Sequence, residues 1–102
     1  MTSQAVFSAL VEPRRRDILQ LVRDRPRSAG EIGSNFEITQ QAVSQHLQIL
    51  RRAGLVDVRR DGQRRIYVIN PQGLETVEQF LADLWPAGLQ RLKRAVEADR
   101  GH

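Results

Sequence analysis

The sequence predicts a mainly helical domain that carries one two-stranded β-hairpin, in the order α-α-α-α-β-β-α. Apolar residues recur every three or four positions over most of the chain, as amphipathic helices require. Asp61-Gly62 stands between two runs in which apolar and polar residues alternate, and such a pair suits both central positions of a type I′ hairpin turn. No repeat or linker divides the 102 residues, so we expect one domain over residues 1–102.

The first two helices are expected on either side of Glu12-Pro13. An apolar run predicts a short first helix over residues 4–11. Proline is well tolerated at the first position of a helix, so the second helix should begin at Pro13 and end before Pro26.

The next two helices should be close together in the sequence. Ser28 and Glu31 have the spacing of a capping box, which predicts a third helix that runs to about Phe36. A fourth helix is expected over residues 39–53, because its first residue is a threonine, a good N-cap, and a glycine follows its last residue.

A final helix is expected over residues 73–98, where apolar residues again lie three or four apart. Pro86 should kink or interrupt this helix at Trp85, because proline lacks a backbone donor and clashes with the preceding turn. A chain of this size has little core of its own, so the apolar face of this helix is expected to pack against a second subunit.

The basic charge is concentrated in one third of the chain. Six arginines and two aspartates lie between Thr39 and Asn70, while the remainder carries ten basic and ten acidic residues. The net charge of +4 therefore has the distribution of a surface that binds a polyanion. A solvated charged face is the simpler alternative.

Several classes of protein are not expected. No apolar run approaches the ~20 residues of a membrane span, and the N-terminus lacks the pattern of a signal peptide, which predicts a cytoplasmic protein. The chain has no cysteine for disulfides or thiolate metal sites. It has no phosphate-binding glycine loop and no nucleophile or zinc-protease motif, and Ser44 and His46 diverge on a helix, so we expect no enzyme activity.

The predicted fourth helix has an amide-rich polar face. Val43, Leu47 and Leu50 fall on one apolar stripe. The other side carries Gln41, Ser44, Gln45, Gln48 and Arg52, with Gln40 and Arg51 at one edge. Amides combine a donor with an acceptor and can read base edges in a major groove, so we interpret the third and fourth helices as a helix-turn-helix. Glutamines on a merely solvated helix are the alternative.

The hairpin places Arg59 and Arg60 on one strand and Arg64 and Arg65 on the other. A hairpin directly after a DNA-reading helix is a wing, whose arginines can contact phosphates or enter the minor groove. Arginines that only keep an exposed hairpin soluble are the alternative. The patterns together predict a winged helix-turn-helix that binds duplex DNA.

Two other binding functions fit part of this pattern. An architectural or non-specific DNA-binding protein would use the arginines but not the amide face, since phosphate contacts carry no sequence information. A winged helix used only for protein contacts would bind no DNA and would show none of the salt dependence of phosphate binding.

Four segments occur in an order that resembles the ArsR family of bacterial transcriptional repressors: FSALVEPRRRDILQLV, SAGEIGSNF, TQQAVSQHLQILRRAGLV and DVRRDGQRRIYVI. The resemblance covers about residues 6–70. It implies a homodimeric repressor that reads a pseudo-palindromic operator through the helix 39–53 and the wing 57–66. It also implies that the first and last helices, about 4–11 and 73–98, form the dimer interface.

Patterns and resemblance together define the candidate site residues. Base readout is assigned to Gln40, Gln41, Ser44 and Gln45. Contacts of the DNA backbone or wing are assigned to Thr39, His46, Gln48, Arg52, Arg59, Arg60, Gly62, Arg64 and Arg65. Dimer contacts are assigned to Val6, Phe7, Leu10, Phe80, Leu81, Leu84, Trp85, Leu89 and Leu92.

The sequence departs from the family where many members bind metals. The third helix lacks cysteine, and the last helix has carboxylates but no histidine before the terminal His102. Carboxylates hold hard cations only weakly unless several converge, so no metal site and no cofactor are expected. No effector ligand can be named from the sequence.

Some residues keep two interpretations. Arg15 and Arg16 match a basic pair of the family and could contact phosphate or form intramolecular ion pairs. His46 is expected to pack or to contact phosphate rather than bind a metal. Phe80 and Trp85 could line an effector pocket, although packing at a dimer interface is the favoured interpretation.

Overall fold

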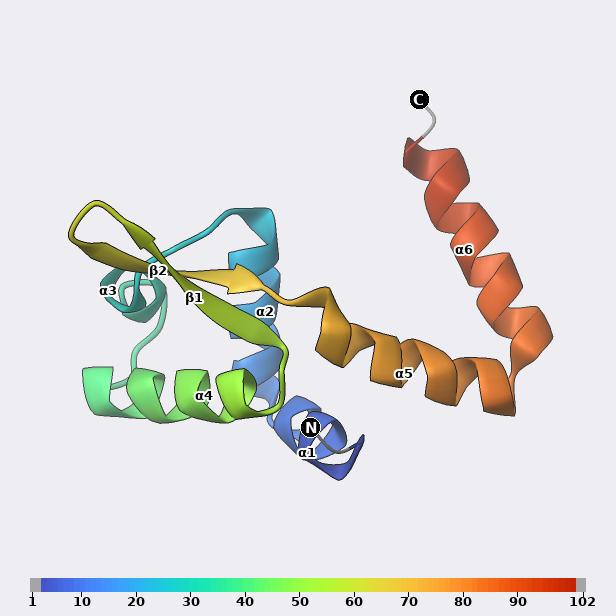
Figure 1. Ribbon diagram of the computed structural model, residues 1–102, viewed down its shortest axis with the longest axis horizontal. Coiled ribbons are helices and arrows are strands. Elements are labelled where there is room, and N and C mark those ends of the chain that lie inside the picture. The colour runs from blue at the N-terminus through green and yellow to red at the C-terminus, as the bar shows by residue number, and fades with distance from the viewer. Residues whose placement is uncertain (1–2, 101–102) are drawn as a thin grey trace.

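The computed structural model describes residues 3–100, which form six helices and one two-stranded antiparallel sheet (Figure 1). The elements are α1 Ser3–Val11, α2 Pro13–Asp24, α3 Ala29–Gly33, α4 Gln40–Arg52, β1 Val56–Asp61, β2 Arg64–Ile69, α5 Pro71–Leu84 and α6 Pro86–Arg100. The predicted mainly helical fold with a single hairpin is confirmed. None of the six helices in residues 3–100 has both the length and the hydropathy that a membrane-spanning segment requires.

The expectation of one last helix is wrong, because the chain after the hairpin forms two helices. Trp85 leaves helical geometry with φ −147° and ψ 67°, and Pro86 has no N–H with which to continue the hydrogen-bond ladder. The interruption predicted at Trp85 is therefore confirmed. It lets α6 project away from the axis of α5 (Figure 1).

Side-chain caps begin the two helices of the helix-turn-helix. The Ser28 hydroxyl accepts a hydrogen bond from the Glu31 N–H, and the Glu31 carboxylate accepts one from the Ser28 N–H, so the predicted capping box is confirmed. Thr39 caps α4 as expected, with its hydroxyl accepting from the amide three residues later. The third helix ends at Gly33 rather than near Phe36, because the amides of Asn35 and Phe36 bond three residues back instead of four.

One apolar core joins the first four helices to the hairpin. Its largest fully buried side chains are Ile18, Ile32, Leu47, Leu50, Leu55, Val6, Val43 and Val56. The predicted apolar stripe of α4 is thus confirmed. The assignment of Val6 to a dimer interface is wrong, because this side chain is 0% exposed within its own protomer.

The hairpin turn differs from the predicted type. Asp61 pairs with Arg64, so the two loop residues are Gly62 and Gln63 rather than Asp61-Gly62. Among these, Gly62 alone has a positive φ, of 66°. A positive φ at the first loop position only is the pattern of a type II′ turn, and glycine is the residue that adopts it without strain.

The hairpin is joined to the connection between α2 and α3 by backbone hydrogen bonds. The Tyr67 N–H donates to the Arg27 carbonyl at 2.7 Å, and the Arg27 N–H donates to the Tyr67 carbonyl at 3.2 Å. Tyr67 itself packs partly buried against the core, as expected. The wing therefore has a rigid base beside the connection between α2 and α3.

The fold separates two ends of the molecule (Figure 1). The hairpin turn and the N-terminal end of α4 lie at one end, with α3 between them. α5 runs from the hairpin toward the opposite side, where α6 follows it. The polar helix face and the basic hairpin thus share one end, and the last two helices lie at the other.

Candidate nucleic-acid interface

The polar face of α4 is open to solvent. Gln41, Ser44, Gln45 and Gln48 are all exposed, while Val43 and Leu47 anchor the other side of the same helix in the core. Burial on one side holds the axis of α4 in place. It therefore presents the amides and the hydroxyl as a rigid row rather than on a flexible loop.

Gln40 lies differently from the other glutamines. A Cβ on Gly33 would clash with the Nε2 atom of Gln40, so the side chain of Gln40 crosses directly over α3. Glycine at position 33 permits this close approach. Gln40 was predicted to read bases, and its contact with α3 was not predicted from the sequence.

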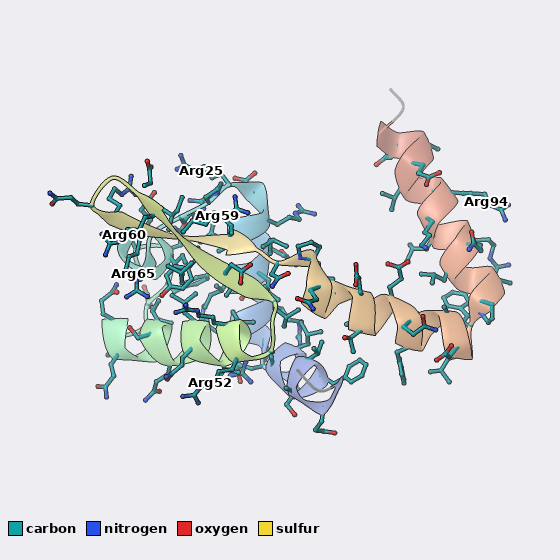
Figure 2. The ribbon with its side chains drawn as sticks, in the orientation of Figure 1. Arg25, Arg52, Arg59, Arg60, Arg65 and Arg94 are labelled. Carbon is teal, nitrogen blue, oxygen red and sulfur yellow. The ribbon has the colours of Figure 1, made fainter. Side chains whose placement is uncertain are left out.

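The wing concentrates arginines at its free end. Arg60 and Arg65 are directly opposed on the two strands and share one face of the hairpin (Figure 2). Like charges in opposed positions are destabilising, and a bound anion would remove that repulsion. Arg59 lies on the other face, and these three arginines are exposed.

Arg64 is the wing arginine that has an internal partner. Its guanidinium forms an ion pair with the Oε1 atom of Glu31 on α3. The same Oε1 atom accepts the Ser28 N–H of the capping box. Hydrogen bonds from Ser28, and then the positive charge of Arg64, lower the pKa of Glu31 below its ordinary value of 4.5. Glu31 did not appear as a site residue in the sequence analysis, because nothing in the sequence places α3 beside β2.

Arg15 and Arg16 close the C-terminal end of α1. Arg15 donates from Nε to the Ala9 carbonyl at 2.7 Å, and Arg16 donates from Nη1 to the Leu10 carbonyl at 2.7 Å. The carbonyls of Ser8 and Val11 accept from the same two side chains, which completes the last four carbonyls of the helix. No ion pair to a carboxylate is found for either arginine in residues 3–100, so that predicted alternative is wrong.

His46 is half-buried between α4 and α2. Its Nδ1 atom lies 3.4 Å from Nη1 of Arg15. Burial first, and then the charge of Arg15, lower the pKa of His46 below its ordinary value of 6.5. A neutral ring turned toward Arg15 is a packed histidine, one of the two roles that the sequence analysis left open.

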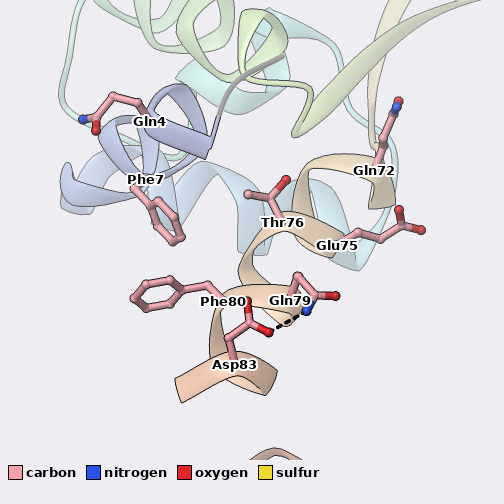
Figure 3. A pocket seen from close by; sticks show the side chains of 8 residues that line it. All are labelled: Gln4, Phe7, Gln72, Glu75, Thr76, Gln79, Phe80 and Asp83. Carbon is pink, nitrogen blue, oxygen red and sulfur yellow. Dashed lines mark hydrogen bonds between the residues drawn. The ribbon is translucent and has the colours of Figure 1, made fainter. Parts of the chain in front are cut away.

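The opposite end of the molecule exposes several large apolar side chains among polar ones. Phe7 on α1 and Phe80 on α5 meet edge to face, with ring centroids 5.0 Å apart. They lie in an open groove between the two helices (Figure 3), whose lining is Gln4, Phe7, Gln72, Glu75, Thr76, Gln79, Phe80 and Asp83. Leu84, Trp85 and Leu92 are more than half exposed. Leu89, which was assigned to the dimer interface, is only 7% exposed and leaves little surface for a partner.

The described part of the chain holds no group of three histidine, aspartate or glutamate side chains that could bind a metal ion. The terminal His102 lies outside the described residues.

The known proteins that this chain resembles are transcriptional regulators, in agreement with the winged helix-turn-helix geometry. Residues 12–58 match the model of the bacterial regulatory proteins of the arsR family. The HTH-type transcriptional regulator Rv2034 of Mycobacterium tuberculosis is 31% identical over 91% of this chain and 87% of its own length. The transcriptional activator HlyU of Vibrio cholerae is 35% identical over 78% and 74% of the two chains. The transcriptional repressor SdpR of Bacillus subtilis is 37% identical over 69% and 78%.

Solved structures agree with these relatives. An ArsR-like transcriptional regulator from Rhodococcus sp. RHA1 superposes with a TM-score of 0.74 at 25% identity, covering 94% of this chain and 90% of its own. The homodimeric winged helix-turn-helix DNA-binding domain of Mb0332 from Mycobacterium bovis gives a TM-score of 0.65 at 32% identity, over 78% and 77%. The chain therefore belongs to the arsR family of bacterial regulatory proteins, which are DNA-binding transcription regulators and not enzymes.

Proposed function

We propose that the protein is a homodimeric repressor that reads a pseudo-palindromic operator, with α4 of each subunit in a major groove. One observation carries this proposal: Gln41, Ser44 and Gln45 are exposed in a row on a helix whose other face is locked in the core. Amides and hydroxyls in such a row can match the donors and acceptors of base edges. The N-terminal half of the second helix is the part that enters the groove in this motif.

The wing and the end of α4 are proposed to position the protein on the DNA backbone. Exposed cations at one end of the molecule support this role: Arg59, Arg60 and Arg65 on the wing. Gln48 and Arg52 continue the exposed face of α4 toward its C-terminus. Gly62 allows the tight turn that brings the wing arginines together, whereas the hydroxyl of Thr39 is engaged as an N-cap.

The exposed apolar face of α5 and α6, with α1 beside it, is proposed to form the dimer interface. Exposed Leu84, Trp85 and Leu92 are better explained by a subunit contact than by solvent. The homodimeric state given for the Mb0332 domain supports the same arrangement. Phe7, Leu10, Phe80 and Leu81 lie at or beside this face, whereas Val6 is buried in the core and Leu89 is buried on α6 outside that core.

Repression is the proposed outcome of binding. Named relatives include both a repressor and an activator, so the name of a relative does not decide the direction. A small dimer that uses one end for DNA and the other for its partner would act by occupying its site and blocking access to it. We also propose that metals do not control it, because the chain has no thiolate and its carboxylates do not converge in residues 3–100.

Enrichment of random or genomic duplex fragments by the purified protein tests this proposal. The expected result is a shared two-fold symmetric motif whose half-sites are ~10 base pairs apart or a multiple of that distance. Enrichment without any common motif would contradict sequence-specific readout and would indicate the alternative, a non-specific or architectural DNA-binding protein. Transcription from a promoter that carries the motif then distinguishes a repressor from an activator.

A further inference from the structure

We propose that Glu31 is an internal competitor for DNA, which holds the wing residue Arg64 on α3 and weakens its binding to the phosphate backbone. This inference rests on the proposed function, because it concerns how the wing meets DNA. Glu31 touches no base in this scheme. It sets the affinity for any duplex by occupying a cation that the duplex would otherwise bind.

The geometry makes Glu31 the fixed member of the pair. Its carboxylate accepts the Ser28 N–H at 3.1 Å, while the Ser28 hydroxyl accepts the Glu31 N–H at 3.2 Å, so two bonds hold residue 31 at the start of α3. The Arg64 side chain is 57% exposed and reaches across from the wing. Arg64 can therefore turn away toward a phosphate, whereas Glu31 stays in place.

The electrostatics favour an exchange of partners on DNA. An exposed ion pair is stabilised only weakly in water, and a duplex offers closely spaced phosphates to the same guanidinium. When Arg64 leaves, however, Glu31 loses its ion-pair partner and remains as a negative charge that only the more weakly acting Arg25 still offsets, beside the DNA-facing end of the molecule. That charge lowers the gain from the new phosphate contact. Arg60 and Arg65 bear no such cost, since they oppose each other and have no carboxylate within 4.0 Å in residues 3–100.

Glu31→Gln is the direct test, because glutamine keeps the capping box and removes only the charge. We expect this variant to bind both operator and random duplex about two- to fivefold more tightly than the wild type, which is the range of an exposed ion pair. The slope of its log affinity against log salt concentration should also be steeper, by up to the contribution of about one additional phosphate contact. Affinities are measured by fluorescence anisotropy over a series of salt concentrations.

Two further variants separate this effect from a general change of charge. Glu37→Gln removes an exposed carboxylate from the connection between α3 and α4. Glu37 forms no ion pair with an arginine in the described residues, so this variant should change the affinity for DNA less than Glu31→Gln does. In an Arg64→Gln background, the gain from Glu31→Gln should shrink to that of Glu37→Gln. A full gain in the absence of Arg64 would overturn the proposal.

Arg64→Gln and Arg65→Gln keep the proposal testable if Glu31→Gln folds poorly. Arg65 has no internal partner to give up, so its loss should weaken DNA binding more than the loss of Arg64. Equal losses, or weaker binding by a folded Glu31→Gln variant, would overturn the proposal and leave the proposed function intact. Salt-insensitive or undetectable binding by the wild-type protein would instead overturn the proposed function and this inference with it.

Discussion

The two ends of this protein use their exposed side chains in opposite ways. At the end formed by α4 and the wing, most exposed groups are amides, a hydroxyl and charged groups, which water solvates well, and Ile49 is the exposed large apolar side chain of α4. At the end formed by α5 and α6, the exposed groups include Leu84, Trp85 and Leu92, which water solvates poorly. Water can solvate the first surface when no DNA is bound, whereas burial against another apolar surface would stabilise the second. In the proposed function, a partner subunit therefore covers the apolar surface in the folded state, and DNA binds the polar surface.

The largest effect is expected from a charge at the apolar end. Leu84→Glu places a carboxylate on a surface that we assign to the subunit contact, and burying an unpaired charge there should raise the dimer dissociation constant at least about thirtyfold. Because Leu84 is 67% exposed in the protomer, the monomer should keep its helical content. Sedimentation velocity and operator binding measure the change. An unchanged dimer would mean that another surface joins the subunits.

A smaller and more selective effect is expected from the polar end. Gln41→Ala should weaken operator binding by ~1–3 kcal/mol while leaving the affinity for random duplex almost unchanged, since a base-edge contact is lost but no phosphate contact. Arg65→Ala is the matched control, which should weaken both duplexes nearly equally and flatten the salt dependence. If Gln41→Ala weakened both duplexes alike, base readout would have to be assigned elsewhere on α4.

Arg15 connects the two ends and should matter mainly for stability. Arg15→Ala removes hydrogen bonds to the carbonyls of Ser8 and Ala9 at the end of α1, next to the proposed dimer face. A loss of ~1–3 kcal/mol in the free energy of unfolding is expected from charged hydrogen bonds of this kind. Urea denaturation measures it. Arg14→Ala serves as a control, because that side chain stacks on Phe36 and caps no carbonyl in the described residues.

The smallest effect should be a pH dependence from His46. Its pKa is lowered in the folded protein by burial and by Arg15, with Arg14 adding to the effect and Glu12 opposing it. The unfolded chain therefore takes up the proton first, so stability is complete above about pH 6.5 and declines as the pH falls through and below that value. Thermal unfolding between about pH 8 and pH 5, the range in which histidine changes its charge, should show a shallower decline of stability for His46→Gln than for the wild type. An identical decline in both proteins would exclude His46 as the source.

Most of the fold could be predicted from local patterns. The capping box at Ser28 and the N-cap at Thr39 involve residues three positions apart, and their energetics are complete within one helical turn. The apolar stripe of α4 depends only on helical periodicity. The turn type was missed because the register placed Asp61 in a strand pair with Arg64, and register depends on packing along the whole hairpin.

The contacts between distant segments could not be predicted. Glu31 meets Arg64 across 33 positions of sequence, and Arg15 meets His46 across 31. Neither spacing follows a helical or strand period, so each pairing exists only because the core sets α3 against β2 and α2 against α4. The same reason explains why Val6 was taken for an interface residue: its position on an apolar helix face was evident, but the element that covers that face was not.

Amino-acid order was enough to establish the winged helix-turn-helix, the exposed amide row of α4 and the family, because these depend on periodicity, caps and a compact motif that short-range interactions specify. Three-dimensional packing was needed to show which arginine is occupied, which apolar residues are already covered, and where the last helix breaks away. Those properties depend on through-space contacts and on the competition between partners for the same side chain. In this protein that competition is clearest at Arg64, where a carboxylate of the chain itself lies within reach of a cation proposed to bind DNA.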